Sequence, residues 1–305
     1  MLYYEKEVSG RDLILNKKDK PVLGFIGTGV MGKSMASRLL NEGYPVHIYT
    51  RTREKAEELL ENGATWKSSV AEIATSSDVI LTMVGYPEDV EEVYFGDDGL
   101  LHNIRSQSIL IDMTTSSPDL AKRIAAEAQS NHSCAMDAPV SGGDIGAQKG
   151  TLSIMAGGEK ETFEKMLPIF ETLGSNYVLQ GPAGAGQFTK MSNQIAIAST
   201  MVGVTEALVY AEKSGLDPDT VLKSISGGAA GSWSLDHLIP RVIKRDFSPG
   251  FFIKHFIKDM KIAIDSAENM ELDLPGLKLA KHMYEQVSEA GEENSGTQAL
   301  YKFYQ

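Results

Sequence analysis

In the first part of the chain, short apolar runs alternate with amphipathic segments. Within residues 31–40, Met31, Met35 and Leu39 recur every four residues beside Ala36, which predicts a helix with one apolar stripe. Strands that alternate with such helices are typical of a doubly wound, mainly parallel sheet with helices on both faces. Four apolar runs have the length expected of buried strands: residues 22–26, 45–49, 78–83 and 108–112.

The pattern changes near residue 182. A glycine-rich stretch at residues 181–186 breaks the chain, and no strand pattern follows it. Residues 187–213 are apolar on nearly every side, which predicts a long helix buried between partners. We expect Gly215 to stop this helix, and Asp217 before Pro218 supplies the cap and the first position of the next one.

These patterns predict an α/β domain followed by an all-α domain, with a long helix between them. The length agrees, because 305 residues exceed what one hydrophobic core usually organises. The predicted segments are an N-terminal extension at residues 1–20, an α/β domain at residues 21–182 and a helical domain at residues 183–305.

The composition describes an acidic chain with one cysteine, Cys134, which cannot form an intramolecular disulfide and so suits a reducing compartment. A net charge of −12 opposes binding to nucleic acid or to anionic lipid, since both need clustered cations. Residues 1–20 have no apolar core long enough for a signal peptide, and no run of about 18 apolar residues predicts a membrane span. We therefore expect a cytoplasmic protein with neither partner. Six scattered histidines also predict no metal site.

A glycine-rich turn joins the first predicted strand to the first predicted helix. The first glycine of such a G-x-G-x-x-G turn permits a tight bend, the second lets the backbone approach a pyrophosphate, and the third lets the helix pack against the strand. The helix N-terminus adds free N–H groups and the positive end of its dipole. A purely structural turn is the alternative, but the strand–turn–helix context favours a Rossmann site for a dinucleotide. The residues of the turn are Gly27, Thr28, Gly29, Val30, Met31 and Gly32.

The end of the second predicted strand indicates which dinucleotide binds. An NAD-selective fold has Asp or Glu about 20 residues after the turn, against the ribose hydroxyls. Here Arg51 and Thr52 follow the strand instead, and they can give a 2′-phosphate charge-assisted and hydroxyl hydrogen bonds. We expect NADP(H) to be preferred and NAD(H) to bind at lower affinity. The alternative is that Arg51 and Arg53 are solvated charges at a strand end.

Three later segments add to the turn. They are Asp137-Ala138-Pro139-Val140-Ser141-Gly142-Gly143, Gly184-Ala185-Gly186-Gln187-Phe188-Thr189-Lys190-Met191-Ser192-Asn193-Gln194, and Lys258-Asp259-Met260, preceded by Phe251. Together with the turn, in order and at compatible spacing, these segments resemble the signatures of the β-hydroxyacid dehydrogenases. That family includes 3-hydroxyisobutyrate dehydrogenase, tartronate semialdehyde reductase, and glyoxylate or succinic semialdehyde reductase. The resemblance implies a Rossmann domain, a helical domain, a homodimer or homotetramer, and hydride transfer at a small carboxylate-bearing 3-hydroxyacid or aldehyde.

Lys190 is the candidate proton donor and acceptor. Reduction of a carbonyl needs a proton for the oxygen, and a nicotinamide supplies only the hydride. Lys190 lies just inside the apolar helix, where desolvation lowers an ammonium pKa towards the working pH. Asn193 and Gln194 follow at i+3 and i+4 and can orient substrate oxygens, and which of the two amides touches substrate is open. A lysine that snorkels at a helix start is the alternative.

Ser141, Gly142 and Gly143 suit a substrate carboxylate. Consecutive glycines expose backbone N–H groups, and the serine adds a hydroxyl donor. An ordinary turn after a strand is the alternative.

The resemblance implies roles for six further residues. Thr115 and Phe251 are expected beside both nicotinamide and substrate, and Met83 and Val84 along the cofactor. Lys258 and Asp259 are expected at the cofactor from the helical domain, with Asp259 close to Lys190. The alternative for these last two is a solvated helix face.

Two other functions stay open. An imine reductase has a similar architecture, but such enzymes generally lack a lysine at the position of Lys190. A non-catalytic NADPH-binding sensor needs the cofactor site but not Lys190, Asn193 or Ser141. In the glycine-rich loop at residues 226–234, Trp233 either shapes the pocket or packs between helices.

Overall fold

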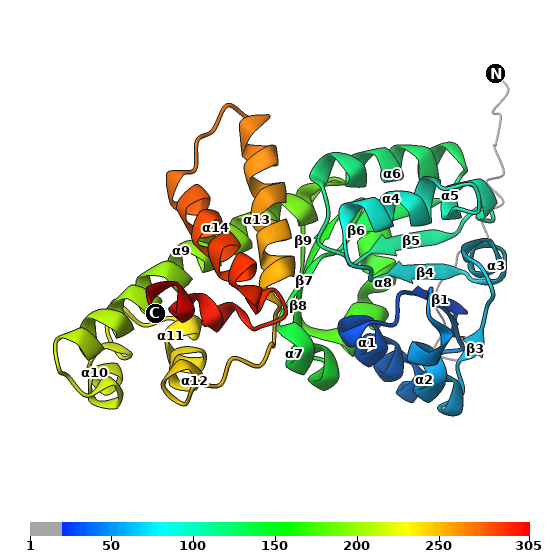
Figure 1. The fold of residues 1–305 in the computed structure, drawn as a ribbon. Coiled ribbons are helices and arrows are strands. Elements are labelled where there is room, and N and C mark those ends of the chain that lie inside the picture. The colour runs from blue at the N-terminus through cyan, green and yellow to red at the C-terminus, as the bar shows by residue number, and fades with distance from the viewer. Residues whose placement is uncertain (1–19) are drawn as a thin grey trace, which may run out of the picture.

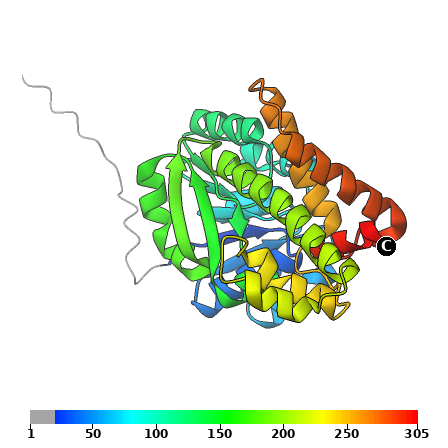
Figure 2. The same ribbon diagram turned by 90° about the vertical axis from the view of Figure 1, so that its left-hand side faces the viewer.

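The computed structural model describes residues 20–305 and places an α/β domain beside a helical domain (Figure 1). The predicted extension at residues 1–20 lies, except for Lys20, outside the described residues. The long helix α9 (Ala185–Lys213) begins against the sheet and runs along the helical domain, as Figures 1 and 2 both show. The last strand of the sheet, β9 (Gly174–Gly181), ends at Gly181. Three residues, Pro182, Ala183 and Gly184, separate it from the start of α9.

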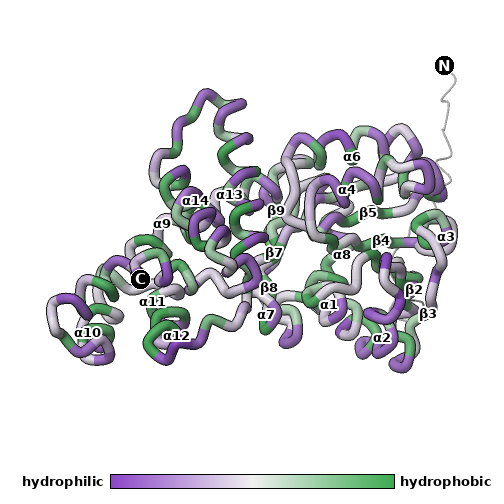
Figure 3. Tube along the Cα trace, viewed as in Figure 1, coloured by the Kyte–Doolittle hydropathy of each residue, from purple (hydrophilic) through white to green (hydrophobic). Residues whose placement is uncertain are grey.

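The four predicted strands are present and parallel. β1 lies between β2 and β4, and β5 follows on the far side of β4. The chain therefore reverses its direction of strand addition at β1 and β4, and ligands of such sheets bind outside the carboxyl ends of the strands at this point. These strands are hydrophobic along most of their length (Figure 3). Their bounds are β1 (Leu23–Ile26), β2 (Val46–Tyr49), β4 (Val79–Thr82) and β5 (Ile109–Asp112).

Further strands extend the sheet on both sides. β3 pairs with β2, and the other side continues through β6 and β8 to β7, with β9 on β8. β8 runs antiparallel to β6 and β7, so the sheet is mainly parallel, as predicted. None of these further strands was predicted from the sequence. Their bounds are β3 (Thr65–Trp66), β6 (Cys134–Asp137), β7 (Val140–Ser141) and β8 (Leu152–Gly157).

Each face of the sheet has its own core. Leu23 and Phe25 of β1 join one core and Ile26 the other, because successive strand side chains point to opposite faces. α1, α2 and α8 cover the first face, and α3, α4, α5 and α6 cover the second. The helices are α1 (Val30–Asn41), α2 (Glu57–Glu61) after the 3₁₀ turn η1 (Arg53–Ala56), α3 (Val70–Ser76), α4 (Pro87–Phe95), α5 (Leu100–Asn103), α6 (Pro118–Ser130), α7 (Gly143–Lys149) and α8 (Lys160–Leu173).

The helical domain packs around α9. Met201 of α9, Phe256 of α13 and Tyr284 of α14 are fully or almost fully buried in its core. Ser214 ends α9 before Gly215 at φ 76°, and the Asp217 side chain caps the next helix, both as predicted. The later elements are α10 (Pro218–Ile225), α11 (Trp233–His237), α12 (Ile239–Ile243), α13 (Ile253–Glu268), α14 (Pro275–Val287), η2 (Ser288–Glu292) and η3 (Thr297–Tyr304).

The predicted burial of the apolar helix α9 between partners is found on one face only within a single chain. Met191, Ala198 and Leu208 are buried, whereas Gly203 is exposed and Tyr210 is 75% exposed. By length and composition α9 could also cross a membrane. However, its buried face contains polar side chains and packs on α13 and α14, as in the core helix of a soluble protein.

Candidate active site

Two of the three glycines in the turn are required by the protein itself. Gly27 has φ 94°, and a Cβ there would lie 2.2 Å from the Met83 carbonyl oxygen. A Cβ on Gly32 would lie 1.9 Å from the Gly27 oxygen. A Cβ on Gly29 would meet nothing within 4 Å, so the space beside this residue is open. Gly29 also caps α1 without a side-chain hydrogen bond, which leaves first-turn N–H groups for an anion.

The other residues of the turn differ in exposure. Val30 is 59% exposed at the start of α1, and Met31 packs against the core under this helix. The Thr28 side chain is buried, and its Oγ1 has no hydrogen-bond partner within residues 20–305. The open side of Gly29 and the uncapped end of α1 fit a pyrophosphate group.

Arg51 lies at the carboxyl edge of the sheet, directly after β2. Its side chain is 80% exposed, and Nη1 pairs with Oδ1 of Asp89 at 2.9 Å. Asp89 lies in the first turn of α4 and also accepts a hydrogen bond from the Tyr86 N–H. Because the Arg51 side chain is solvated, water screens this ion pair, and a phosphate can compete with Asp89 for the guanidinium. Thr52 is exposed beside Arg51 and occupies the N-cap position of η1 without a side-chain capping hydrogen bond.

The loops after β4 and β5 are linked beside the glycine-rich turn. The Met83 N–H donates to the Ile26 carbonyl, and the Val84 N–H donates to Thr114 Oγ1 at 3.0 Å. The Val84 side chain would lie 3.2 Å from a Cβ on Gly27. Met83 and Val84 therefore border the glycine-rich turn, and their contact with the cofactor stays a prediction.

Side chains of the helical domain bind the backbone around Thr115. Gln187 of α9 donates to the Thr114 carbonyl at 2.7 Å and accepts from the Ser116 N–H at 3.0 Å. Lys258 of α13 donates to the Thr115 carbonyl at 2.8 Å and to the Gly85 carbonyl at 3.2 Å. No role was predicted for Gln187 from the sequence. Its position three residues before Lys190, on the same helix face, was the available signal.

Asp137 fixes the start of α9 against the sheet. One carboxylate oxygen accepts from the Gly184 N–H and the other from the Gln187 N–H, each at 2.7 Å. Burial raises the Asp137 pKa, and these hydrogen bonds oppose the rise. A Cβ on Gly186 would lie 2.3 Å from the Met155 carbonyl oxygen, so only glycine permits this close approach of helix and sheet.

Lys190 is buried one turn into α9, with 6% of its surface exposed. Desolvation lowers its pKa from 10.5 to about 8, while the charge of Asp259 raises it and that of Lys258 lowers it. Within the described part of the chain, Nζ has no hydrogen-bond or ion-pair partner. A side chain that is only 6% exposed does not extend into solvent as a snorkelling lysine would, which favours the predicted role over the snorkelling alternative.

Asp259 is 1% exposed and lies between two polar side chains. Its Oδ2 accepts from Gln194 at 2.6 Å, and its Oδ1 is 3.1 Å from Lys258 Nζ. Asn193 in turn donates to the Gln194 side-chain oxygen at 2.7 Å. Because Asp259 and Lys258 are both largely buried, the alternative of a solvated helix face is wrong.

The predicted carboxylate loop lies opposite the helical domain. Ser141 ends β7 and pairs with Ser153 of β8, while Gly142 and Gly143 have φ of 127° and 64°. A Cβ on Gly143 would lie 3.5 Å from the Gly250 carbonyl oxygen, so this loop faces the segment that contains Phe251. The Phe251 ring makes an edge contact with Phe256, with centroids 5.7 Å apart.

Family models match both parts of the chain. Residues 22–181 match the NAD binding domain of 6-phosphogluconate dehydrogenase, and residues 184–304 match the NAD-binding domain of NADP-dependent 3-hydroxyisobutyrate dehydrogenase. The chain belongs to the β-hydroxyacid dehydrogenase family. As a member of this family, it is an NAD(P)-dependent oxidoreductase of the 3-hydroxyacid dehydrogenase type.

Individual members of the β-hydroxyacid dehydrogenase family agree over nearly the whole length. An uncharacterised oxidoreductase of Bacillus subtilis is 61% identical over 93% of this chain and 99% of its own. The 2-hydroxy-3-oxopropionate reductase of Escherichia coli is 41% identical over 86% of this chain and 89% of its own. The structure of Mycobacterium tuberculosis 3-hydroxyisobutyrate dehydrogenase with L-serine has a TM-score of 0.87 at 28% identity, covering 94% of this chain and 100% of that one.

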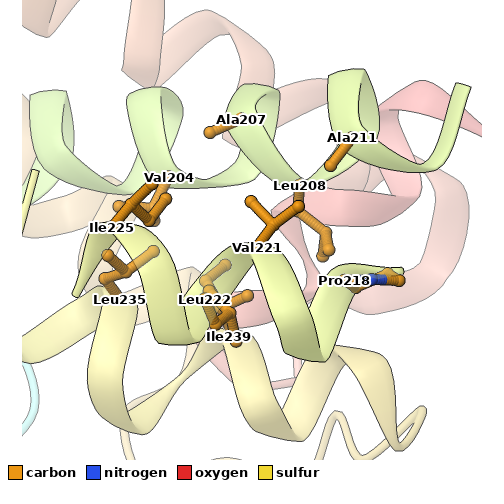
Figure 4. A pocket seen from close by; sticks show the side chains of 10 residues that line it. All are labelled: Val204, Ala207, Leu208, Ala211, Pro218, Val221, Leu222, Ile225, Leu235 and Ile239. Carbon is orange, nitrogen blue, oxygen red and sulfur yellow. The ribbon is translucent and has the colours of Figure 1, made fainter. Parts of the chain in front are cut away.

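Two features of this β-hydroxyacid dehydrogenase lie away from Lys190. Figure 4 shows an apolar groove between α9 and α10 to α12, and Val204 in its wall is about 21 Å from Lys190 along the helix axis. Trp233 is 66% exposed and stacks on His237, on the helix whose Leu235 lines this groove. Within a single chain Trp233 therefore packs neither against the residues around Lys190 nor between helices, and both interpretations of Trp233 stay predictions. Within residues 20–305 no cluster of His, Cys, Asp or Glu could hold a metal ion.

Proposed function

We propose that this enzyme transfers hydride between NADP(H) and a small carboxylate-bearing 3-hydroxyacid or aldehyde, with Lys190 as the proton donor and acceptor. The observation that supports this proposal most strongly is the burial of the Lys190 ammonium without a hydrogen-bond partner in the described part of the chain. The group is buried at the junction of the two domains and has no partner within the described residues. A buried charge without a partner is costly, and a substrate oxygen at this position would supply the missing acceptor.

The pKa of Lys190 suits reversible proton transfer. At about 8, it leaves both the ammonium and the amine populated near neutral pH. When bound, the nicotinamide supplies the hydride. In reduction Lys190 gives its proton to the carbonyl oxygen, and in oxidation the neutral amine takes the proton of the hydroxyl group. The charge of Asp259 favours reprotonation of the amine.

We assign the substrate carboxylate to Ser141, Gly142 and Gly143. The positive φ angles of Gly142 and Gly143 and the neighbouring Ser141 hydroxyl support this assignment. Asn193 is half-buried, whereas both polar groups of the Gln194 amide already have protein partners. We therefore assign substrate contact to Asn193 and the support of Asp259 to Gln194. Thr115 and Phe251 complete this assignment at the substrate.

NADP(H) is the proposed cofactor, with Arg51 and Thr52 at its 2′-phosphate. The guanidinium is exposed at the carboxyl edge of the sheet, where a 2′-phosphate would compete with its ion-pair partner Asp89. NAD(H) would bind through the same glycine-rich turn at lower affinity. Lys258, between the Gly85 and Thr115 carbonyls, is the proposed contact from the helical domain.

A substrate panel tests this function. 2-Hydroxy-3-oxopropionate, 3-hydroxyisobutyrate, glyoxylate and succinic semialdehyde are each assayed with NADPH and NADH, beside a cyclic imine. We expect turnover of at least one carboxylate substrate, faster with NADPH. Turnover of the imine alone would support an imine reductase. NADPH binding without turnover of any compound would support the sensor.

We also infer that the enzyme is a cytoplasmic homodimer or homotetramer, without a nucleic-acid or membrane partner. Tyr210 on α9, Leu216 after it and Trp233 on α11 expose large apolar surfaces on the helical domain. A second copy of the chain that covered these side chains would remove their apolar area from water. Light scattering at micromolar concentration tests this inference, and a single species at the monomer mass of 33.1 kDa would contradict it.

A further inference from the structure

The Gln187 side chain is fully buried, with 0% of its surface exposed, at the junction of α9 with the loop after β5. A buried amide is costly unless its donor and its acceptor both have partners. Here both are satisfied by the backbone of one short segment. Nε2 donates to the Thr114 carbonyl at 2.7 Å, and Oε1 accepts from the Ser116 N–H at 3.0 Å.

This pair of hydrogen bonds resembles the contact that a neighbouring β-strand would make with the same segment. The carbonyl of one residue and the N–H two residues later both point to one side, where a strand would receive them. β5 ends at Asp112. At Thr114 and Ser116, beyond the end of β5, the Gln187 amide makes the hydrogen bonds that a neighbouring strand would otherwise make. The amide therefore fixes the backbone on both sides of Thr115.

The same residue is tied to the rest of the site. Its backbone N–H donates to Asp137 at the end of β6, and Lys190 follows it by one helical turn on the same face of α9. Lys258 binds the Thr115 carbonyl, which Gln187 leaves free. The turn of α9 that contains Lys190 is thus fixed at one end to the sheet and at its side to the Thr115 loop.

We propose that Gln187 is a positioning residue that sets the distance between Lys190 and the Thr115 loop. This proposal rests on the proposed role of Lys190 as proton donor. Gln187 touches neither substrate nor cofactor and acts through the backbone that it holds. A displacement of about 1 Å between reacting groups can cost about 10²-fold in rate. The two hydrogen bonds of the Gln187 side chain, here called the Gln187 clamp, are therefore expected to affect kcat more than cofactor affinity.

Gln187→Glu gives a direct test because the acid has two states. A protonated carboxyl can donate to the Thr114 carbonyl and accept from the Ser116 N–H, as the amide does. An ionised carboxylate cannot donate, and it would face the Thr114 oxygen as a second acceptor. The ratio of variant to parent kcat/KM should therefore be near one at the lowest pH and fall at least 10-fold as pH rises. Gln187→Met should lose at least 10-fold in kcat at every pH, with the NADPH Kd within about threefold of the parent, because the glycine-rich turn is unchanged.

Asn131→Asp is the matched control. Asn131 also donates its amide to a backbone carbonyl, that of Leu101 at 2.9 Å, but it lies after α6 at the opposite edge of the sheet. Its ratio to the parent should not change with pH. A folded Gln187→Glu variant with a ratio constant in pH would overturn the proposal. A variant that unfolds at the higher pH would assign Gln187 to folding alone and would also overturn it.

Lys190→Met, assayed beside these variants, separates the two proposals. If Lys190→Met is inactive and the Gln187→Glu ratio does not change with pH, the positioning role of Gln187 is contradicted and the proton-donor role of Lys190 is supported. If Lys190→Met is active and the Gln187→Glu ratio falls as pH rises, the proton-donor role of Lys190 is contradicted and the hold of Gln187 on the Thr115 loop is supported.

Discussion

Gln194 donates a hydrogen bond of 2.6 Å to Asp259, so the carboxylate whose charge acts on Lys190 is held by the helix that contains the lysine. Lys258 lies on the other oxygen of Asp259 at 3.1 Å. Desolvation and the Lys258 charge lower the Lys190 pKa, and Asp259 opposes both. The balance of these effects gives a lysine that can exchange a proton near physiological pH.

Asp259→Asn should lower the Lys190 pKa below its present value of about 8, because it removes the charge that favours the ammonium. Reduction needs the protonated lysine, so the decline of kcat/KM at high pH should begin at a lower pH in the variant. The pH profile of aldehyde reduction measures this shift. A decline at the parental pH, or at a higher one, would contradict the electrostatic account.

Gly29→Ala should fold normally and lose NADPH affinity at least 10-fold. The new methyl group would meet no protein atom within 4 Å, but it would occupy the space through which the backbone approaches a pyrophosphate. Gly32→Ala is the contrasting variant, since its Cβ would lie 1.9 Å from the Gly27 oxygen. Gly32→Ala should lower the free energy of unfolding by about 1–3 kcal/mol. Cofactor titration and urea unfolding distinguish the two, and normal NADPH binding by folded Gly29→Ala would contradict the assigned site.

Arg51→Ala should weaken NADPH binding about 10- to 100-fold, as expected for the loss of charged hydrogen bonds worth about 1.5–3 kcal/mol. NADH affinity should change less than twofold, since it has no 2′-phosphate. Fluorescence titration with both cofactors gives the comparison. Lys149→Ala, which removes an exposed cation from α7, serves as the charge control. Equal losses for NADPH and NADH would show that Arg51 does not contact the phosphate.

Asp112 should make the enzyme less stable as pH rises. Burial raises its pKa in the folded protein from 3.8 to about 7. Between these values the unfolded state releases its proton first, so the contribution of Asp112 to the free energy of unfolding falls through this window and stays low above it. Asp112→Asn does not titrate but can still accept from the Thr114 N–H. Its stability relative to the parent should therefore increase from pH 4 to pH 8 in urea unfolding, and a constant difference would contradict the assignment.

The sequence predicts those parts of the fold in which one pattern repeats without interruption. β1, the glycine-rich turn and α1 were predicted within one residue at either end, because strand, turn and helix each have a local signal. β7 has only two residues, and β6 lacks the buried apolar run of β1, since only its last two residues, Met136 and Asp137, are buried. Their pairing with β8 depends on contacts between distant segments. The domain boundaries and the individual site residues stay predictions.

The site was predicted by residue type more readily than by partner. Lys190 and Asp259 were expected near each other from their motifs, and the charge of Asp259 does act on Lys190. Gln187 received no role, because its partners lie more than 70 residues earlier in the chain. The exposure of Trp233 and of one face of α9 was also missed, since apolar composition does not say whether a partner within the same chain covers a side chain.

The most direct test of the central claim compares Lys190→Met with the parent on the best substrate of the panel, using NADPH at saturation. Methionine keeps the length of the apolar stem and removes the proton. NADPH affinity should stay within about threefold of the parent, and kcat should fall about 10²- to 10⁴-fold, the usual contribution of general acid–base catalysis. A Lys190→Met enzyme that binds NADPH and retains kcat within threefold of the parent would contradict the role of Lys190 as proton donor.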